Sequence, residues 1–148
     1  MELYAAKEEQ LAVLVRLSKE AFESDVLVGA PKGDCPPDYD SVPWHQKMME
    51  EGHLFAAMEG GTIVGGAILF PDESSFSVYV GRIFVDPKEF RKGYGIAIMK
   101  AVEALFPKAR SFRLDTPEWN IRTNRFYQKL GYQEEKREDG FVYYCHKK

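Results

Sequence analysis

The segment from residue 85 to residue 95 constrains the fold most, because it joins an apolar strand to an amphipathic helix through a glycine turn. It reads VDPKEFRKGYG. Gly93 and Gly95 lack a Cβ, so successive backbone N–H groups can turn towards one concavity, and the following helix adds its positive N-terminal end. Basic side chains surround that concavity, namely Lys88, Arg91 and Lys92. The segment therefore predicts either a site for a pyrophosphate-bearing ligand or an ordinary strand-to-helix turn.

The glycine spacing argues against two nucleotide-binding motifs. The segment lacks the third glycine of a dinucleotide fingerprint, and it lacks the Gly-Lys-Ser/Thr ending of a P-loop. On its own the remaining Gly-x-Gly pattern does not distinguish a ligand site from a backbone turn. A second pattern further along the chain is needed for that decision.

The second pattern is a strand followed by a capped helix. Residues 111–115 (SFRLD) are typical of a strand, and residues 119–132 (WNIRTNRFYQKLGY) are typical of a helix. Asn120 is a plausible N-cap and Gly131 a plausible C-terminal stop. The order of strand, basic glycine loop, helix, strand and NxxxxxFYxxLGY helix resembles the GNAT superfamily of acyl-CoA-dependent N-acyltransferases. The resemblance extends over most of the chain and is most specific over residues 76–132.

This resemblance implies acetyl-CoA as cosubstrate, with no metal ion. The family's loop motif is Gln or Arg, two residues, Gly, one residue, then Gly or Ala, so Phe90 stands where Gln or Arg is expected. Backbone N–H groups of residues 91–95 remain able to hold the pyrophosphate. The residues that the resemblance assigns to cosubstrate binding are Ile83, Phe84, Val85, Arg91, Lys92, Gly93, Tyr94, Gly95, Ile96 and Asn120.

Composition agrees with one domain over residues 1–148. The chain is 45% hydrophobic and 14% aromatic, enough to bury a core without metal or disulfide support. A net charge of -3 argues against a general nucleic-acid binder, and no apolar run reaches membrane-spanning length. Residues 1–10 do not look like a signal peptide, and the spacing of Cys35 and Cys145 suggests neither a zinc site nor a disulfide framework. We therefore expect a cytoplasmic protein.

The first half of the chain predicts a helical and β-rich arrangement. Residues 2–6 predict a short strand. One predicted helical face follows and carries Leu11, Leu14, Val15, Ser18, Ala21 and Phe22. Residues 24–42 contain Pro31, Gly33 and two more prolines, which predict a long surface loop. Ser41 then begins a short helix that ends at Gly52.

The rest of the chain predicts a sheet. Residues 53–58 and 62–70 flank a Gly-Gly turn, residues 76–85 form the next strand, and residues 132–137 and 141–146 flank Asp-Gly, a strong hairpin signal. The expected fold class is α+β, or an α/β three-layer arrangement, with a mixed, mostly antiparallel sheet of about seven strands and four helices. The resemblance adds a splay between the fourth and fifth strands, where acyl-CoA would lie.

The expected chemistry is attack of a primary amine on a thioester. The departing thiol has a pKa of about 8.5, so a weakly acidic donor beside sulfur suits its protonation. By motif position Tyr127 matches the family's general acid, although an aromatic residue at this spacing also suits core packing. A backbone N–H near Phe84 or Val85 would meet the oxyanion. The fourth strand carries no acid between residues 77 and 85, so the candidate bases are elsewhere: Asp115, Glu118, His45, Asp38 or water.

Acceptor contacts are expected from the long loop and the short helix after it. The resemblance places substrate contacts there, and the stretch is acidic and aromatic. Its candidates are Asp38, Tyr39, Trp44 and His45, with Asp34 and Asp40 adding charge. Carboxylates and aromatic faces attract cations, which favours a small cationic amine or peptide amine as acceptor. The alternative is that the aromatic side chains cover the sheet while the aspartates stay solvated.

Two functions remain open at this stage. The first is an N-acetyltransferase that works by direct transfer, and the second is a non-catalytic acyl-CoA-binding sensor or interaction module. Arg122 and Arg125 either reach a nucleotide phosphate or lie in solvent. A homodimer is possible by resemblance alone.

Overall fold

The computed structural model describes residues 1–30 and 35–148, and its strands form a seven-stranded sheet in the order β1-β2-β3-β4-β5-β7-β6. The strands are β1 (Glu2–Ala5), β2 (Leu54–Glu59), β3 (Thr62–Asp72), β4 (Ser77–Val85), β5 (Ser111–Pro117), β6 (Gln133–Glu138) and β7 (Phe141–Lys147). Neighbouring strands run antiparallel except β4 and β5, which are parallel. The predicted mixed, mostly antiparallel sheet is therefore confirmed.

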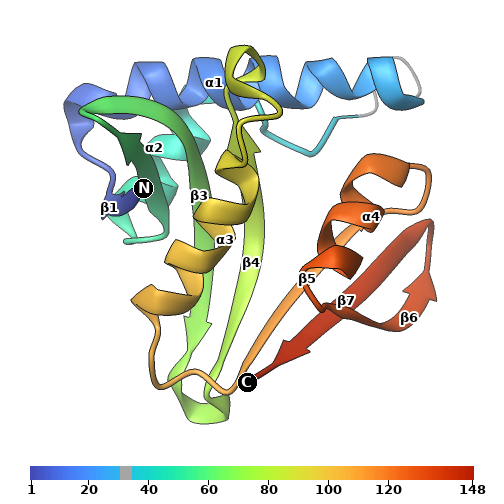
Figure 1. The fold of residues 1–148 in the computed structure, drawn as a ribbon. Helices are drawn as coiled ribbons and strands as arrows, with labels where there is room; N and C mark the ends of the chain where they lie inside the picture. Colours follow the sequence, from blue (N-terminus) through green and yellow to red (C-terminus); the bar gives the residue numbers. More distant parts are fainter. Residues whose placement is uncertain (31–34) are drawn as a thin grey trace.

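The helices cover the two faces of this sheet unequally (Figure 1). They are α1 (Leu11–Glu23), α2 (Val42–Glu50), α3 (Tyr94–Leu105) and α4 (Ile121–Lys129). One apolar cluster joins α1 and α2 to β2, β3 and β4, and the other joins α3 and α4 to the opposite face along most of the sheet. These two clusters thus cover both faces of the sheet over β2–β4. Over β5 and β7 they cover only one face.

The α1 helix shows how the apolar pattern positions this layer. Leu14, Leu17 and Ser18 are almost completely buried, and Leu17 was not on the face expected from the sequence. A 3-10 turn at Glu8–Gln10 precedes the helix and carries the first-turn acids. Burial of a leucine of this kind stabilises the fold by roughly 1.5–3 kcal/mol. The α1 helix is therefore fixed firmly over β3 and β4.

A bulge in β4 changes which residues face each layer. Register with β3 jumps from Ile68 opposite Arg82 to Leu69 opposite Val80, which leaves Gly81 as the extra residue. Before the bulge Val80 belongs to the α3 layer, and after it Phe84 belongs to the α1 layer. A Cβ at Gly81 would come within 2.6 Å of the Phe70 ring, which explains the glycine.

The sheet splits just where this bulge begins. The parallel strands pair only over the first residues of each, Ser77 to Tyr79 of β4 with Ser111 to Arg113 of β5. Beyond these pairs β4 and β5 diverge as the two arms of a V (Figure 1), as the family resemblance implied. One edge of β4 is consequently left without a strand partner along residues 80–85.

Some element bounds differ from those expected. The segment predicted as a loop over residues 24–42 begins instead with a 3-10 helix, Ser24–Val28. Gly29, with a φ of 105°, ends this helix. The α4 helix begins at Ile121 instead of residue 119, since Asn120 is its N-cap. Pro31, Gly33 and Asp34 of the predicted loop lie outside the described residues. Within the described ranges, no helix has the length and apolar character needed to cross a membrane.

Candidate active site

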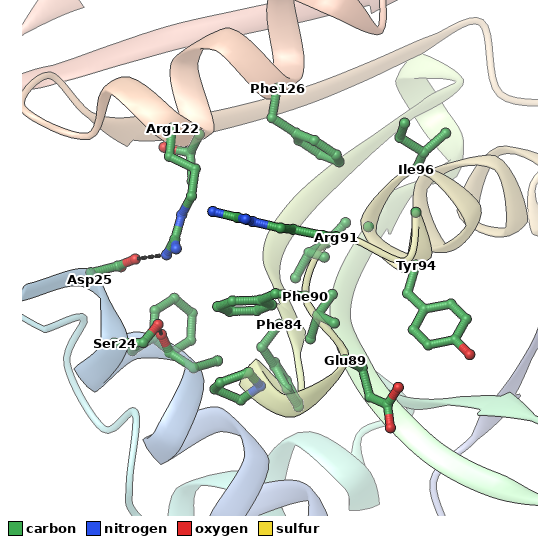
Figure 2. Close-up of a pocket in the computed structure, with 18 of the residues that line it drawn as sticks. Ser24, Asp25, Phe84, Glu89, Phe90, Arg91, Tyr94, Ile96, Arg122 and Phe126 are labelled. Atoms are coloured by element: carbon green, nitrogen blue, oxygen red, sulfur yellow. Dashed lines mark hydrogen bonds and ion pairs between the residues drawn. The ribbon is translucent and has the colours of Figure 1, made fainter. Parts of the chain in front are cut away.

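A cavity of about 800 Å³ occupies the open side of the split (Figure 2). Its walls come from the end of α1 and the turn after it, the end of β4, the loop that leads into α3, and one face of α4. This volume lies within the range of ordinary small-molecule sites, roughly 300–1,000 Å³. Most of the predicted cosubstrate residues line it: Ile83, Phe84, Val85, Arg91, Gly93, Tyr94, Gly95 and Ile96, together with Tyr127.

The loop between β4 and α3 presents unpaired main chain to this cavity. Arg91 and Gly93 have φ values of 71° and 79°, both in the left-handed region. Within the described ranges, the consecutive backbone N–H groups from Arg91 to Ile96 donate to no protein acceptor; the first helix bond runs from Ala97 N to Gly93 O at 3.1 Å. Consecutive free amides at a helix start form a concavity suited to an anion.

The second glycine of the loop has a separate role. A Cβ at Gly95 would lie 3.1 Å from the ring of Phe126, so the missing side chain allows α3 and α4 to approach closely. Phe126 in turn lies against Tyr127, with ring centroids 5.1 Å apart. The glycine motif thus sets both the loop conformation and the distance between the cavity's walls.

Two predicted cosubstrate residues lie outside the cavity lining. Lys92 forms an ion pair with Glu89, with 2.6 Å between Nζ and Oε2. Asn120 is only 2% exposed, and its side-chain oxygen accepts a hydrogen bond from Thr123 N at 3.1 Å. Asn120 therefore caps α4, as the sequence indicated, while its predicted contact with a cosubstrate stays a prediction.

Tyr127 lies between the cavity and the core. Its ring packs against those of Tyr132 and Tyr144, at centroid distances of 5.8 and 6.2 Å. Burial raises the pKa of the Tyr127 phenol, and the nearby Asp115 carboxylate raises it further. Its hydroxyl makes no hydrogen bond within the described part of the chain. The phenol therefore stays protonated at neutral pH and has a proton to donate.

Asp115 lies across the split from β4. The Tyr79 hydroxyl, from the last paired residue of β4, donates a hydrogen bond to its carboxylate, which lies two residues beyond the last paired residue of β5. Burial, and then this bond, raise the pKa of the Tyr79 phenol. Leu114 and Thr116 on either side of Asp115 are buried, so Asp115 faces away from the α3 and α4 layer. The carboxylate and the Tyr127 phenol therefore approach the split from opposite faces of the sheet.

The other candidate bases are engaged elsewhere. Glu118 forms an exposed ion pair with Arg137 at 3.2 Å. His45 is 0% exposed, and its Nδ1 lies 2.7 Å from the Ser41 carbonyl oxygen. Burial lowers the pKa of the His45 imidazole. Asp38 lies in the turn before α2, with φ at 60°.

The predicted acceptor residues belong to the α1 and α2 layer and do not line the cavity. The Tyr39 hydroxyl donates to Glu23 at 2.8 Å, and the Tyr39 carbonyl accepts from Ser18. Trp44 lies under the Arg82 guanidinium, 4.3 Å from ring centroid to Cζ. The structure thus groups Asp38, Tyr39, Trp44 and His45 together, apart from the loop and Tyr127.

The cavity lining also contains residues that were not assigned to the site from the sequence, among them Asp25, and it contains Arg122, for which the sequence left a nucleotide phosphate or solvent open. Asp25 follows α1 and forms an ion pair with Arg122 of α4, 2.6 Å between oxygen and nitrogen. The Arg122 guanidinium also lies 5.1 Å from the centroid of the Phe90 ring. Asp25 and Arg122 are 97 residues apart, so no local pattern indicated their contact. Over the described residues, no His, Cys, Asp and Glu side chains gather as a metal site would require.

Known proteins resemble this chain at the level of both sequence and fold. Residues 13–132 match the family model described as the acetyltransferase (GNAT) family. A UPF0039 protein of Schizosaccharomyces pombe is 31% identical over 87 residues, a match that spans 56% of this chain and only 55% of that protein.

Solved structures share the whole fold at low identity. The PaiA N-acetyltransferase of Thermoplasma acidophilum, in complex with coenzyme A, has a TM-score of 0.85 and 16% identity over 99% of this chain and 98% of its own. The ribosomal-protein-S18-alanine N-acetyltransferase of Escherichia coli has a TM-score of 0.75 and 16% identity over 98% and 92% of the two chains.

Proposed function

This chain belongs to the GNAT family of acetyltransferases, and from that premise we propose that it moves an acetyl group from acetyl-CoA to a primary amine. The observation that carries the proposal is the row of unpaired amides from Arg91 to Ile96, which opens into the same cavity as Tyr127. An anion-binding loop and a protonated phenol in one cavity match a ligand with phosphate at one end and a thioester at the other.

Coenzyme A would lie along the cavity from the loop before α3 to Tyr127. The pyrophosphate would accept hydrogen bonds from the amides of residues 91–96, which have no protein partner to displace. The pantetheine would lie along Ile83, Phe84 and Val85, where the edge of β4 facing β5 is unpaired. The thioester would then reach Tyr127. A backbone N–H near Phe84 or Val85 is available to the oxyanion.

Two side chains divide the proton transfers between them. The Asp115 carboxylate, held by Tyr79, takes a proton from the acceptor's ammonium and so frees the lone pair. The amine nitrogen attacks the thioester carbonyl, the C–N bond forms and the C–S bond breaks. The Tyr127 phenol gives its proton to the departing sulfur, and the amide nitrogen loses its second proton to restore the phenol through solvent. The products are an N-acetyl amine, free coenzyme A and one proton released.

The acceptor is proposed to be a small amine or a peptide amine that enters from the face of Asp115. The E. coli relative is named for acetylating the alanine of a ribosomal protein, so peptides with an N-terminal alanine belong among the acceptors tested. Asp38, Tyr39, Trp44 and His45 of the α1 and α2 layer are proposed to set acceptor preference rather than to transfer protons.

The test follows thiol release from acetyl-CoA over a panel of polyamines, amino sugars, amino acids and short peptides. Wild-type protein is compared with Tyr127→Phe, which keeps the ring packing and removes the proton donor. We expect turnover on at least one acceptor and a kcat lowered about 100-fold in the variant, within the usual range for general acid catalysis. Tyr4→Phe, on the exposed first strand, is the matched control and keeps wild-type turnover.

Each outcome separates the two candidate functions. Coenzyme A binding by calorimetry without turnover on any acceptor would support a sensor or interaction module. Absence of coenzyme A binding would overturn both functions. Turnover that is equal in wild type and Tyr127→Phe would leave an enzyme with a different proton donor.

A further inference from the structure

An ion pair crosses the mouth of the cavity. Figure 2 shows the Asp25 carboxylate, from the turn after α1, directed at the Arg122 guanidinium of α4. The two groups approach to 2.6 Å. Because Asp25 belongs to the first half of the chain and Arg122 to the second, this contact ties together the two arms of the V at their open end.

Positive charge is in excess around this ion pair. The Arg91 side chain extends across the cavity towards that of Arg122 (Figure 2), and within the described part of the chain it has no ion-pair partner. The ring of Phe90 lies under the Arg122 guanidinium. Two guanidinium groups, those of Arg91 and Arg122, therefore approach each other. Among the described residues, Asp25 is the one carboxylate that forms an ion pair with either of them. Arginine favours oxyanions in such sites because its fork matches phosphate and carboxylate geometry.

Asp25 is held there against an energetic cost. Burial raises the pKa of its carboxyl and outweighs the opposing effects of Arg122 and of a hydrogen bond with Asn120. A partly buried ion pair is weak evidence for a stabilising role, so its place beside the cavity points to a role in ligand binding. The carboxylate occupies the position that an anionic ligand would take at the same guanidinium.

We propose that Arg91 and Arg122 clamp a phosphate group of the cosubstrate, and that Asp25 holds Arg122 until that phosphate displaces it. The inference rests on the proposed function, because it takes acetyl-CoA as the ligand of this cavity. It also explains how the loop works with Phe90 in place of a polar side chain. The ring face of Phe90 contacts the Arg122 guanidinium, so α4 supplies the polar group that the loop lacks at residue 90.

The exchange is favourable because one oxyanion replaces another. A pyrophosphate or a phosphate monoester carries up to two negative charges against one for a carboxylate, and Arg91 adds a second guanidinium for it to contact. The released Asp25 carboxylate regains its hydration in solvent. In the ligand-free protein, however, only molecules in which Asp25 has released Arg122 are ready to bind phosphate, so the apparent affinity equals the intrinsic affinity multiplied by that free fraction.

The decisive variant is Asp25→Asn, titrated with coenzyme A by calorimetry. If Asp25 holds Arg122 in about nine of ten ligand-free molecules, removing its charge tightens the apparent Kd about tenfold. A purely structural ion pair predicts the reverse, since its loss would loosen the cavity and weaken binding. An unchanged or weaker Kd in Asp25→Asn, in a protein that does bind coenzyme A, overturns the inference.

A second variant tests the arginine. Arg122→Gln is expected to weaken coenzyme A binding by about tenfold to a hundredfold, the usual effect of losing a hydrogen bond to a charged group. Arg122→Lys should recover only part of the loss, because it keeps the charge but not the fork. In the Arg122→Gln background, Asp25→Asn should no longer tighten binding. An equal gain in both backgrounds would show that Asp25 does not act through Arg122.

Matched controls separate this inference from simpler effects. Glu135→Gln removes a carboxylate from another arginine pair, with Arg113 outside the cavity, and gives the same change in net charge. It should leave the Kd unchanged. Pantetheine, which lacks phosphate, should bind Asp25→Asn and wild type equally, and dephospho-coenzyme A reports which phosphate is held. If no variant binds coenzyme A, the proposed function fails first.

Discussion

The two walls of the cavity are built in different ways. The first wall, from the end of β4 through the loop to α3, offers mainly main chain: the free edge of residues 83–85 and the amides of residues 91–96. It lies in the part of the sheet that is covered on both faces. The second wall, from α4, offers side chains, and its strands are covered mainly on one face.

This difference bears on how each wall tolerates substitution. A main-chain wall depends on backbone conformation and tolerates many side chains, which is why Phe90 can stand in the loop. A side-chain wall depends on individual groups, such as Tyr127 and Arg122, and tolerates few substitutions. Variants of the first wall should therefore change affinity together with stability, and variants of the second should change turnover or affinity with little change in stability.

The largest effect is expected from the second arm of the sheet, at Asp115. Asp115→Asn keeps the size of the side chain and an acceptor for the Tyr79 hydroxyl but removes the base. We expect kcat to fall about 100-fold or more, within the range for general base catalysis. The Kd for coenzyme A should change by less than about twofold. Steady-state kinetics and calorimetry measure the two values.

Tyr79→Phe tests how Asp115 is held. Removing the hydroxyl leaves the base in place but less ordered, so kcat should fall about tenfold or less. A larger loss from Tyr79→Phe than from Asp115→Asn would assign the proton transfer to the phenol instead.

The next effect is expected in the first wall, at Gly93. Gly93→Ala places a Cβ at a φ of 79°, which costs about 1–2 kcal/mol of unfolding free energy. Because it also distorts the amide row, coenzyme A binding should weaken about tenfold. Gly60→Ala, at φ 57° in the β2–β3 turn, is the control. It should lose similar stability in urea unfolding and no affinity; equal affinity losses would mean that the loop conformation is not what binds.

A third effect concerns the layer behind the first wall, at His45. Burial lowers the pKa of His45. The hydrogen bond with the Ser41 carbonyl opposes this shift, Arg82 adds to it, and Asp38 and Asp40 oppose it further. The unfolded chain therefore binds a proton below pH 6.5 that the folded chain resists. Stability from this group is complete above that pH and falls as pH drops towards the folded pKa, with a slope below about 1.4 kcal/mol per pH unit.

Urea unfolding at several pH values between 7.5 and 5 measures this slope. His45→Gln should flatten the slope even though it lowers stability overall. A slope that is the same in wild type and His45→Gln would assign the acid sensitivity to other groups.

The smallest effect is expected at Phe90. Phe90→Gln restores the residue type of the family's loop motif but removes the ring under Arg122. A gained hydrogen bond and a lost cation–π contact are each about 1 kcal/mol, so the Kd for coenzyme A should change less than about threefold. A tightening of tenfold or more would show that this side chain matters and that the first wall does not act through main chain alone.

The sequence predicted local features well because each has a local cause. Gly93 sits at positive φ, Asn120 caps its helix, and the Asp-Gly pair turns the last hairpin. The strand and helix bounds are mostly within one or two residues of expectation, since apolar periodicity and turn residues act over short distances. The family resemblance supplied the splay of the sheet.

Features that depend on distant contacts were not predicted. The Gly81 bulge follows from how β4 meets β3 and Phe70, and nothing in the neighbouring residues marks it. Leu17 lies outside the apolar face expected for α1 but is buried, because the layer around α1 covers more of the helix than that face. The Asp25–Arg122 ion pair forms only when the fold brings α4 beside the end of α1. Tertiary packing, rather than local propensity, decides each of these.

The outermost strand of the second arm has a consequence for the protein in concentrated solution. All residues of β6 are exposed, and the strand reads QEEKRE, with both signs of charge. An edge strand with this composition repels other strands, so it is a poor template for intermolecular β-pairing. The free edge of β4 at the split differs, because residues 83–85 face α4 across the cavity. Charge thus discourages strand pairing at the outer margin of the sheet, whereas the helix opposite limits it at the inner one.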